Sequence, residues 1–171
     1  QMPSSDPNFA TTFTDVGGEI GAFYGHVMEG VFQSDAELQE ANALDGDENS
    51  PYQNGAAPGD IRFKDLNGDG RISPDDRQVI GSPFPDFYYG LNGSINYRNI
   101  DLSIFFQGTQ GNDVYNLLWA GINEGEGDNN ATTNMLDRWT PENTVTDVPR
   151  AITGDPNDNK RPSTRFIEDG S

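Results

Sequence analysis

A twelve-residue stretch from Asp65 to Asp76 carries oxygen-bearing side chains at the spacing of a calcium-binding loop. Oxygen donors stand at loop positions 1, 3 and 5, and a glycine at position 6, Gly70, allows a sharp turn. A hard cation such as Ca²⁺ prefers a ring of carboxylate, amide and carbonyl oxygens. The sequence therefore predicts a Ca²⁺ site with the ligands Asp65, Asn67, Asp69, Arg71 (through its backbone carbonyl), Ser73 and Asp76.

This loop departs from the strongest calcium-binding pattern at its last position. Asp76 stands at position 12, where a longer glutamate supplies two oxygens, and the chain contains no second copy of the loop. We therefore expect a modest affinity, closer to that of extracellular sites than of cytosolic sensors. Ile72 at position 8 is expected to hold the loop against a small apolar contact. The alternative is a solvated loop of Asx turns that binds no ion.

The other reactive residues show no arrangement for catalysis. The chain has no cysteine and one histidine, His26, for which we expect a structural or surface role. No zinc-protease, hydrolase or phosphate-loop motif is present, and carboxylates are so abundant that a glycosidase-like pair would arise by chance. We therefore expect no enzymatic activity. Three aromatic residues are candidates for stacking on a sugar or contacting a partner, with local packing as the favoured alternative: Tyr115, Trp119 and Trp139.

Charge and aromatic residues are distributed unevenly along the chain. The 171 residues include 28 acidic and 10 basic ones, a formal net charge of −18 that disfavours binding to nucleic acid. Residues 1–85 have a net charge of −11 and residues 111–171 of −6, whereas residues 86–110 carry only −1. Seven of the eighteen aromatic residues lie between Phe84 and Phe106, which argues against disorder. A nearly neutral aromatic segment is thus flanked by two acidic arms.

This central segment has the alternation of an antiparallel strand pair. Residues 87–97 and 100–109 each alternate apolar with mostly polar side chains, and Arg98-Asn99 between them is short enough for a hairpin loop. Each run has about the length of a tilted membrane-spanning β-strand, roughly 9–11 residues. One face would suit lipid and the other a wet lumen. Alternation alone does not distinguish this from a strand pair with one face in a protein core, which is the commoner origin of the pattern.

Short elements are expected in both acidic arms. Residues 20–32 favour a bent strand pair, and Ser34 with Glu37 forms a capping box that predicts a helix over residues 35–42. Residues 112–120 and 132–139 each predict a short helix, the second ending before Pro141. Together with the hairpin, these patterns indicate an all-β chain with short loop helices.

Much of the sequence closely resembles the C-terminal region of SusC/RagA-type TonB-linked outer-membrane transporters. The resemblance is strongest from Ala57 to Asn116, which includes DLNGDGRISPDD and the run PFPDFYYGLNGSINYRNIDLSIFFQG. The flanking stretches agree in content and order: GGEIGAFYGHVMEGVFQS (17–34), NMLDRWTPENTVTDVPRA (134–151) and RPSTRFIEDGS (161–171). Together they cover most of the chain.

The resemblance implies a 22-stranded β-barrel in the Gram-negative outer membrane, with an N-terminal plug in its lumen. A SusD-like surface lipoprotein closes over such a barrel, and TonB drives the import of oligosaccharides or peptides. The 171 residues contain no TonB box, plug or closing C-terminal strand, so we expect a segment of a larger protein that contacts TonB through the missing N-terminal part. In this interpretation residues 86–110 form a transmembrane hairpin.

Short periplasmic turns and long outer loops are typical of such barrels, which places Arg98-Asn99 in the periplasm. Residues 1–85, with the calcium-type loop at 65–76, and residues 111–171, leading to a next barrel strand, are then extracellular. The first functional hypothesis is a segment of a TonB-dependent importer in contact with outer-membrane lipid. The alternative is a secreted calcium-dependent β-rich module that binds glycans or acts as an adhesin.

Overall fold

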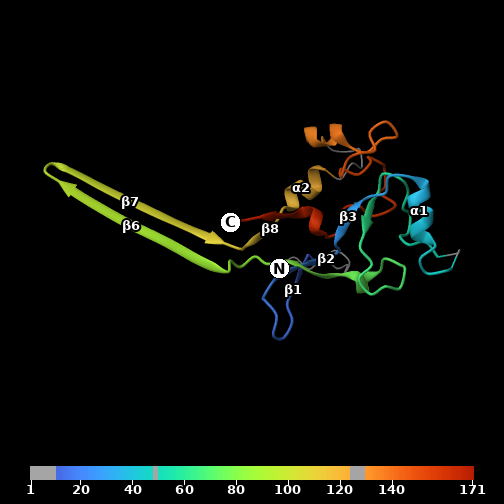
Figure 1. Cartoon of the computed structure of the whole chain (residues 1–171), viewed down its shortest axis with the longest axis horizontal. Coiled ribbons are helices and arrows are strands. Elements are labelled where there is room, and N and C mark those ends of the chain that lie inside the picture. The colour runs from blue at the N-terminus through green and yellow to red at the C-terminus, as the bar shows by residue number, and fades with distance from the viewer. Residues whose placement is uncertain (1–10, 48–49, 124–129) are drawn as a thin grey trace.

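The computed structural model describes residues 11–47, 50–123 and 130–171 of the chain. Figure 1 shows a long two-stranded hairpin that projects from a lobe in which the other described helices and strands are gathered. Both strands meet the lobe at the end opposite their turn. The described residues are mostly strands with a few short helices, in agreement with the predicted all-β class with loop helices.

The hairpin consists of strands β6 (Phe87–Tyr97) and β7 (Ile100–Gln110), as the alternation predicts. The two strands pair antiparallel without a register shift, from Phe87 opposite Gln110 to Tyr97 opposite Ile100. Arg98 takes a φ of 54°, in the left-handed region, which lets the chain reverse direction within two residues. The Arg98 guanidinium lies 5.3 Å from the centre of the Tyr97 ring, so the turn is also held by a cation–π contact.

The register of the hairpin determines what each face presents. Leu91 lies opposite Phe106 and Ile95 opposite Leu102, so the apolar residues of both strands share one face. The other face carries mostly small and polar residues, with Tyr88 and Phe105 as aromatic exceptions. Both faces are exposed almost throughout, since only two of the 22 strand residues are partly covered. No other described part of the chain forms a core against the apolar face.

The lobe contains three small antiparallel sheets. Strand β2 (Ala22–Gly25) lies between β1 (Thr12–Phe13) and β5 (Gln78–Gly81), β3 (Met28–Val31) pairs with β4 (Ile61–Phe63), and β8 (Asp113–Tyr115) pairs with β9 (Ile167–Asp169). The predicted strand pair over residues 20–32 is therefore wrong in its partners. Both strands form but do not pair with each other: β2 lies between the nearby β1 and the distant β5, and β3 pairs with the distant β4, which local alternation does not reveal.

Helix α1 (Asp35–Asn42) has the predicted bounds, and the Ser34 side chain accepts a hydrogen bond from the Glu37 N–H at 3.3 Å. The Glu37 carboxylate reaches the N–H of Gln33 at 2.8 Å, one residue before the position that a capping box predicts. This contact still satisfies an N–H group at the start of the helix.

The two other predicted helices differ from the structure. Residues 113–115 form β8 because they pair with β9, and the helix α2 begins only at Leu117 and ends at Ile122. Thr133–Asp137 is a short 3₁₀ helix (η3), the form that a single tight turn commonly takes. Further 3₁₀ turns are η2 (Pro74–Asp76) and η4 (Thr164–Phe166). No helix within the described ranges is both long and apolar enough to span a membrane.

The apolar core of the lobe is small, as expected for a chain with 33% hydrophobic residues. Phe32 is fully buried and packs with Ala41 of α1 and with Tyr52. The partly buried side chains Leu38, Ala56 and Ile72 close this cluster. Ile72 thus makes the apolar contact that the calcium-type loop pattern predicts.

Candidate functional site

The calcium-type loop lies between β4 and η2 and is attached to the core through Tyr52. The Tyr52 hydroxyl donates to the Phe63 carbonyl at 2.8 Å and accepts from the Asp65 N–H at 3.2 Å. The Ile72 N–H donates to the Tyr52 carbonyl at 2.7 Å. One buried residue, Tyr52, therefore holds the loop at its first position and again at its eighth.

Asp76 connects the two ends of the loop. Its side chain is fully buried, and one carboxylate oxygen accepts the N–H groups of Leu66 (3.0 Å) and Asn67 (3.4 Å). The other oxygen accepts the Ser73 N–H at 2.7 Å, which completes a capping box at η2. Burial by itself raises the pKa of Asp76, but the backbone N–H donors of Ser73, Leu66 and Asn67 together lower it below the usual value. Asp76 is thus a structural carboxylate that stays ionised.

The remaining predicted ligands also bind backbone groups of the loop. Asp65 accepts from Gly68 N–H (2.7 Å) and Gly70 N–H (2.8 Å) through its two oxygens. Asn67 accepts from the Asp69 N–H at 2.8 Å, and Asp69 accepts from the Arg71 N–H at 2.9 Å. These are the Asx turns that the alternative interpretation of the loop describes.

Two residues of the loop, Gly70 and Arg71, hold it against residues 45–47. The Arg71 guanidinium binds Asp45 at 2.7 Å and lies 3.7 Å from Asp47. Gly70 has a φ of 80°, and a Cβ at this position would stand 2.7 Å from the backbone nitrogen of Asp45. A larger residue at Gly70 would therefore be opposed by both conformation and space.

The described residues contain no group of three or more Asp, Glu, His or Cys side chains arranged to hold a metal ion. The carboxylates of Asp65, Asp69 and Asp76 are directed at separate backbone N–H groups instead. Calcium binding by this loop therefore stays a prediction, in which an ion would compete with these donors.

The three aromatic candidates have separate surroundings. Tyr115 of β8 lies between the rings of Phe23 (5.9 Å) and Phe166 (6.0 Å), and burial raises its pKa to about 12. Trp139 packs on Gly59 so closely that a Cβ there would stand 2.5 Å from the indole. Trp119 lies half-buried in α2, where its backbone N–H donates to the Asn116 side-chain oxygen at 2.8 Å. For Tyr115 and Trp139 these contacts are local packing.

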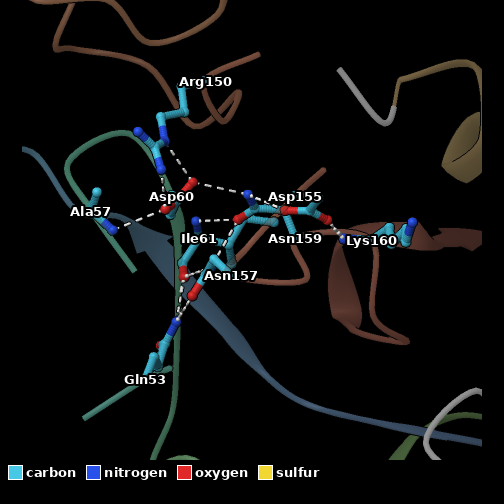
Figure 2. A network of polar contacts seen from close by, with 9 residues as sticks. All are labelled: Gln53, Ala57, Asp60, Ile61, Arg150, Asp155, Asn157, Asn159 and Lys160. Atoms are coloured by element: carbon cyan, nitrogen blue, oxygen red, sulfur yellow. Dashed lines mark hydrogen bonds and ion pairs between the residues drawn. The ribbon is translucent and has the colours of Figure 1, made fainter. Parts of the chain in front are cut away.

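A buried polar network joins two parts of the lobe that are about ninety residues apart (Figure 2). Arg150 donates to both carboxylate oxygens of Asp60, at 2.8 and 2.9 Å. Asn159 donates to Asp60 at 3.0 Å and to Asp155 at 2.9 Å, and accepts from the Ile61 N–H at 2.7 Å. The sequence analysis missed this network, for which the polar run DPNDN at 155–159 is the only local sign.

Gln53 and Asn157 extend the same network to the backbone of Ile61 in β4 (Figure 2). Both side chains donate to the Ile61 carbonyl, at 2.8 and 3.1 Å, and Gln53 also donates to Asn157 at 2.9 Å. Gln53 and Asn157 are fully buried or nearly so. Because their polar atoms are paired with one another and with the backbone, the network is a structural support for β4 and the loop that follows it.

His26 is buried, as a structural role requires, and its ring lies 5.4 Å from that of Phe63. Its backbone N–H donates to the Pro162 carbonyl at 2.9 Å, and its backbone carbonyl accepts from the Thr164 N–H at 3.0 Å. The Nδ1 atom has no hydrogen-bond partner. Burial first, and then the charges of Arg161 and Arg77, lower the pKa of His26 to about 4 against the opposing effect of Asp76.

Comparison with known proteins gives relatives of one class. No protein-family model matches the chain. The chain is 39% identical over 160 residues to TonB-dependent receptor P26 of Formosa agariphila, and this match covers 91% of the chain. It is 38% identical over 155 residues to TonB-dependent receptor P3 of the same organism, again over 91% of the chain.

These matches cover only 15% and 14% of the lengths of the two relatives. The chain is therefore homologous to a segment of TonB-dependent receptors. The predicted relationship to TonB-linked transporters is confirmed at this level.

Proposed function

We propose that this chain is a segment of a TonB-dependent outer-membrane importer of the SusC/RagA type. The homology to segments of two TonB-dependent receptors supports the transport class. The motif run from residue 57 to 116 supports the subtype. Such an importer takes up oligosaccharides or peptides, pairs with a SusD-like surface lipoprotein and obtains energy through TonB. The role is transport and not enzymatic activity.

The observation that carries the proposal is the register of β6 and β7. It gathers the apolar side chains of both strands on one exposed face and mostly polar ones on the other. Eleven residues at about 3.4 Å each, tilted by about 40°, rise about 28 Å, close to the roughly 25 Å apolar band of an outer-membrane barrel. An isolated soluble module would leave this whole face in water, at an unfavourable free energy.

The hairpin turn and the lobe lie at opposite ends of the strands (Figure 1). We assign the short Arg98-Asn99 turn to the periplasm and the acidic lobe to the outside of the cell, since long loops are typical of the outer face. The two ends of the hairpin carry aromatic residues, Phe87 and Tyr89 at one and Tyr97 at the other, as barrel strands do at the two interfaces.

Calcium binding by the 65–76 loop is a further part of the proposal. The twelve-residue spacing of oxygen donors supports it. Ca²⁺ would have to compete with three backbone N–H donors for Asp76, so we expect an affinity in the range of extracellular modules, about 10⁻⁴–10⁻³ M. Calcium would organise the loop and take no part in chemistry.

Spin labels on the hairpin test the membrane assignment. The chain has no cysteine, so single cysteines at Ser103 and Ile104, neighbours on opposite faces, can be labelled in the full-length protein reconstituted in lipid, with any cysteines elsewhere in that protein replaced. We expect the label at residue 104 to be accessible to oxygen, which dissolves in lipid, and the label at 103 to a water-soluble nickel chelate. Equal access of the chelate to both positions would contradict the proposal.

A further inference from the structure

A groove of about 1070 Å³ lies between strand β3 and the 144–147 segment. Its lining includes Glu29, Gly30 and Val31 on one side and residues 144–147 on the other. It is separate from the hairpin and from the calcium-type loop, neither of which contributes a lining residue. This volume slightly exceeds the roughly 1,000 Å³ that the larger pockets for drug-sized ligands reach, so there is room for several residues of an extended peptide.

The side chains around the groove are predominantly acidic. Four carboxylates line it against one guanidinium, that of Arg62: Glu29, Glu37, Asp137 and Asp147. Arg62 is already engaged, at 3.1 Å from Glu29 and 3.0 Å from Glu37. The described residues contain no metal-binding arrangement of three acidic side chains, so these charges do not converge on one ion. They suit positive charges that are spread along a ligand.

On its β3 side the groove is lined by a strand that pairs with another strand along one edge. Phe32 follows β3 and bonds the 59–60 segment. Its N–H donates to the Asp60 carbonyl at 2.9 Å, and its carbonyl accepts from the Gly59 N–H at 2.7 Å. Because backbone groups alternate in direction along an extended chain, those of Val31 point to the other side. Within the described ranges, its carbonyl there accepts the Gln33 side chain at 2.9 Å and no backbone group outside the β3–β4 pair. Among the described strands, β3 has β4 as its one neighbour, so no described strand pairs with its opposite edge.

We propose that this groove docks a short basic peptide segment in an extended conformation. The segment adds to the free edge of β3 through its backbone, and its lysine or arginine side chains reach the surrounding carboxylates. No aromatic side chain lines the groove, so it lacks the stacking surface that a sugar ring favours. The proposal concerns a surface of the lobe and does not depend on transport through the membrane.

The test measures binding of a fluorescein-labelled seven-residue peptide of alternating lysine and threonine to the full-length protein in detergent. The groove variant Asp137→Asn/Asp147→Asn removes two carboxylate charges and keeps side-chain shape. The matched variant Asp15→Asn/Asp75→Asn removes two exposed charges outside the groove. We expect the groove variant to weaken binding by about five-fold or more and the matched variant to change it little.

Two further peptides separate the parts of the proposal. A peptide with glutamate in place of lysine should not bind, and one with N-methylated backbone amides at alternate residues should bind several-fold more weakly. Equal weakening by the groove and matched variants would show attraction to the overall negative charge and would overturn the site. So would unchanged binding by the groove variant, which would place the peptide elsewhere. Neither outcome bears on the spin-label test of the membrane hairpin.

Discussion

Arg150 holds Asp60 through both carboxylate oxygens, at 2.8 and 2.9 Å, across about ninety residues of sequence. Asp60 is fully buried and Arg150 is about one-fifth exposed. A planar guanidinium matches the two oxygens of a carboxylate, so this pair fixes geometry as well as charge. The Ala57 N–H at 2.9 Å and Asn159 at 3.0 Å complete the surroundings of Asp60.

The substitution Asp60→Asn should loosen the junction between the 57–61 and 150–160 segments. An asparagine keeps the size of the side chain but leaves the Arg150 charge without a counter-ion and provides one acceptor oxygen instead of two. We expect the free energy of local opening to fall by about 2–3 kcal/mol. Hydrogen exchange of the Ile61 and Arg150 amides in the full-length protein measures it, because both amides are bonded at this junction.

Glu142→Gln provides the control for this experiment. Glu142 is exposed and lies outside the network, so its neutralisation should change the same amides by less than about 0.5 kcal/mol. Equal protection in the Asp60 variant and the wild type would mean that the pair contributes nothing to holding the segments together.

The hairpin and helix α1 could be predicted because their signals are local. Alternation with period two gives β6 and β7 within one residue of their bounds, and Ser34 before Glu37 gives the start of α1. The Asp65–Asp76 pattern likewise gives the loop and the apolar contact of Ile72. In each case the residues that determine the structure lie within a few positions of one another.

The sheets of the lobe could not be predicted in this way. Strand β8 pairs with β9 more than fifty residues later, and residues 113–115 carry no sign of that partner. Arg150 and Asp60 show the same limit for the polar network, since nothing near either residue indicates the other. Pairing of distant segments needs information from the whole chain, which a single local pattern does not contain.

His26 predicts a specific pH dependence of the lobe. Its pKa of about 4 in the folded protein is below the ordinary value of 6.5, so the unfolded state binds a proton first as the pH falls. Above pH 6.5 the ring is neutral in both states, and the free energy of unfolding has its full value. As the pH falls from 6.5 toward 4, the unfolded state takes up the proton and this free energy decreases by up to about 3 kcal/mol. His26→Gln removes this titration and should flatten the slope between pH 6.5 and 4.

The Thr164 amide reports this effect, because it donates to the His26 carbonyl. Its exchange, corrected for the intrinsic rate, should lose protection between pH 7 and 5 in the wild type more than in the variant. Carboxylates that titrate near pH 4 are common to both proteins, so the difference isolates His26, which is the single histidine of the chain. Parallel slopes in the two proteins would show that burial of His26 has no such consequence.

The calcium prediction is decided by titration calorimetry on wild type and Asp69→Ala. Asp69 is exposed and supplies one predicted ligand, and its other known contacts are with Asn67 and the Arg71 N–H. We expect heat of Ca²⁺ binding for the wild type and at least about ten-fold weaker binding for the variant. Asp75→Ala, which removes a neighbouring carboxylate outside the predicted ligand set, should bind as the wild type does. Identical heats for all three proteins would exclude the site.

Opposite faces of β7 should respond differently to a buried charge. Ile104 lies on the apolar face opposite Gly93, and its neighbour Ser103 lies on the polar face opposite Ser94. Both positions are near the middle of the strand, where an arginine facing lipid costs about 2–4 kcal/mol and one facing a wet lumen costs little. Ile104→Arg should therefore lower the unfolding free energy of the full-length protein in lipid by about that amount, and Ser103→Arg by less than about 1 kcal/mol. Urea titration of the two variants measures the difference. If the polar-face variant were as destabilised as the apolar-face one, β6 and β7 would both be buried in protein on each side, and the lipid-facing assignment of this hairpin would be wrong.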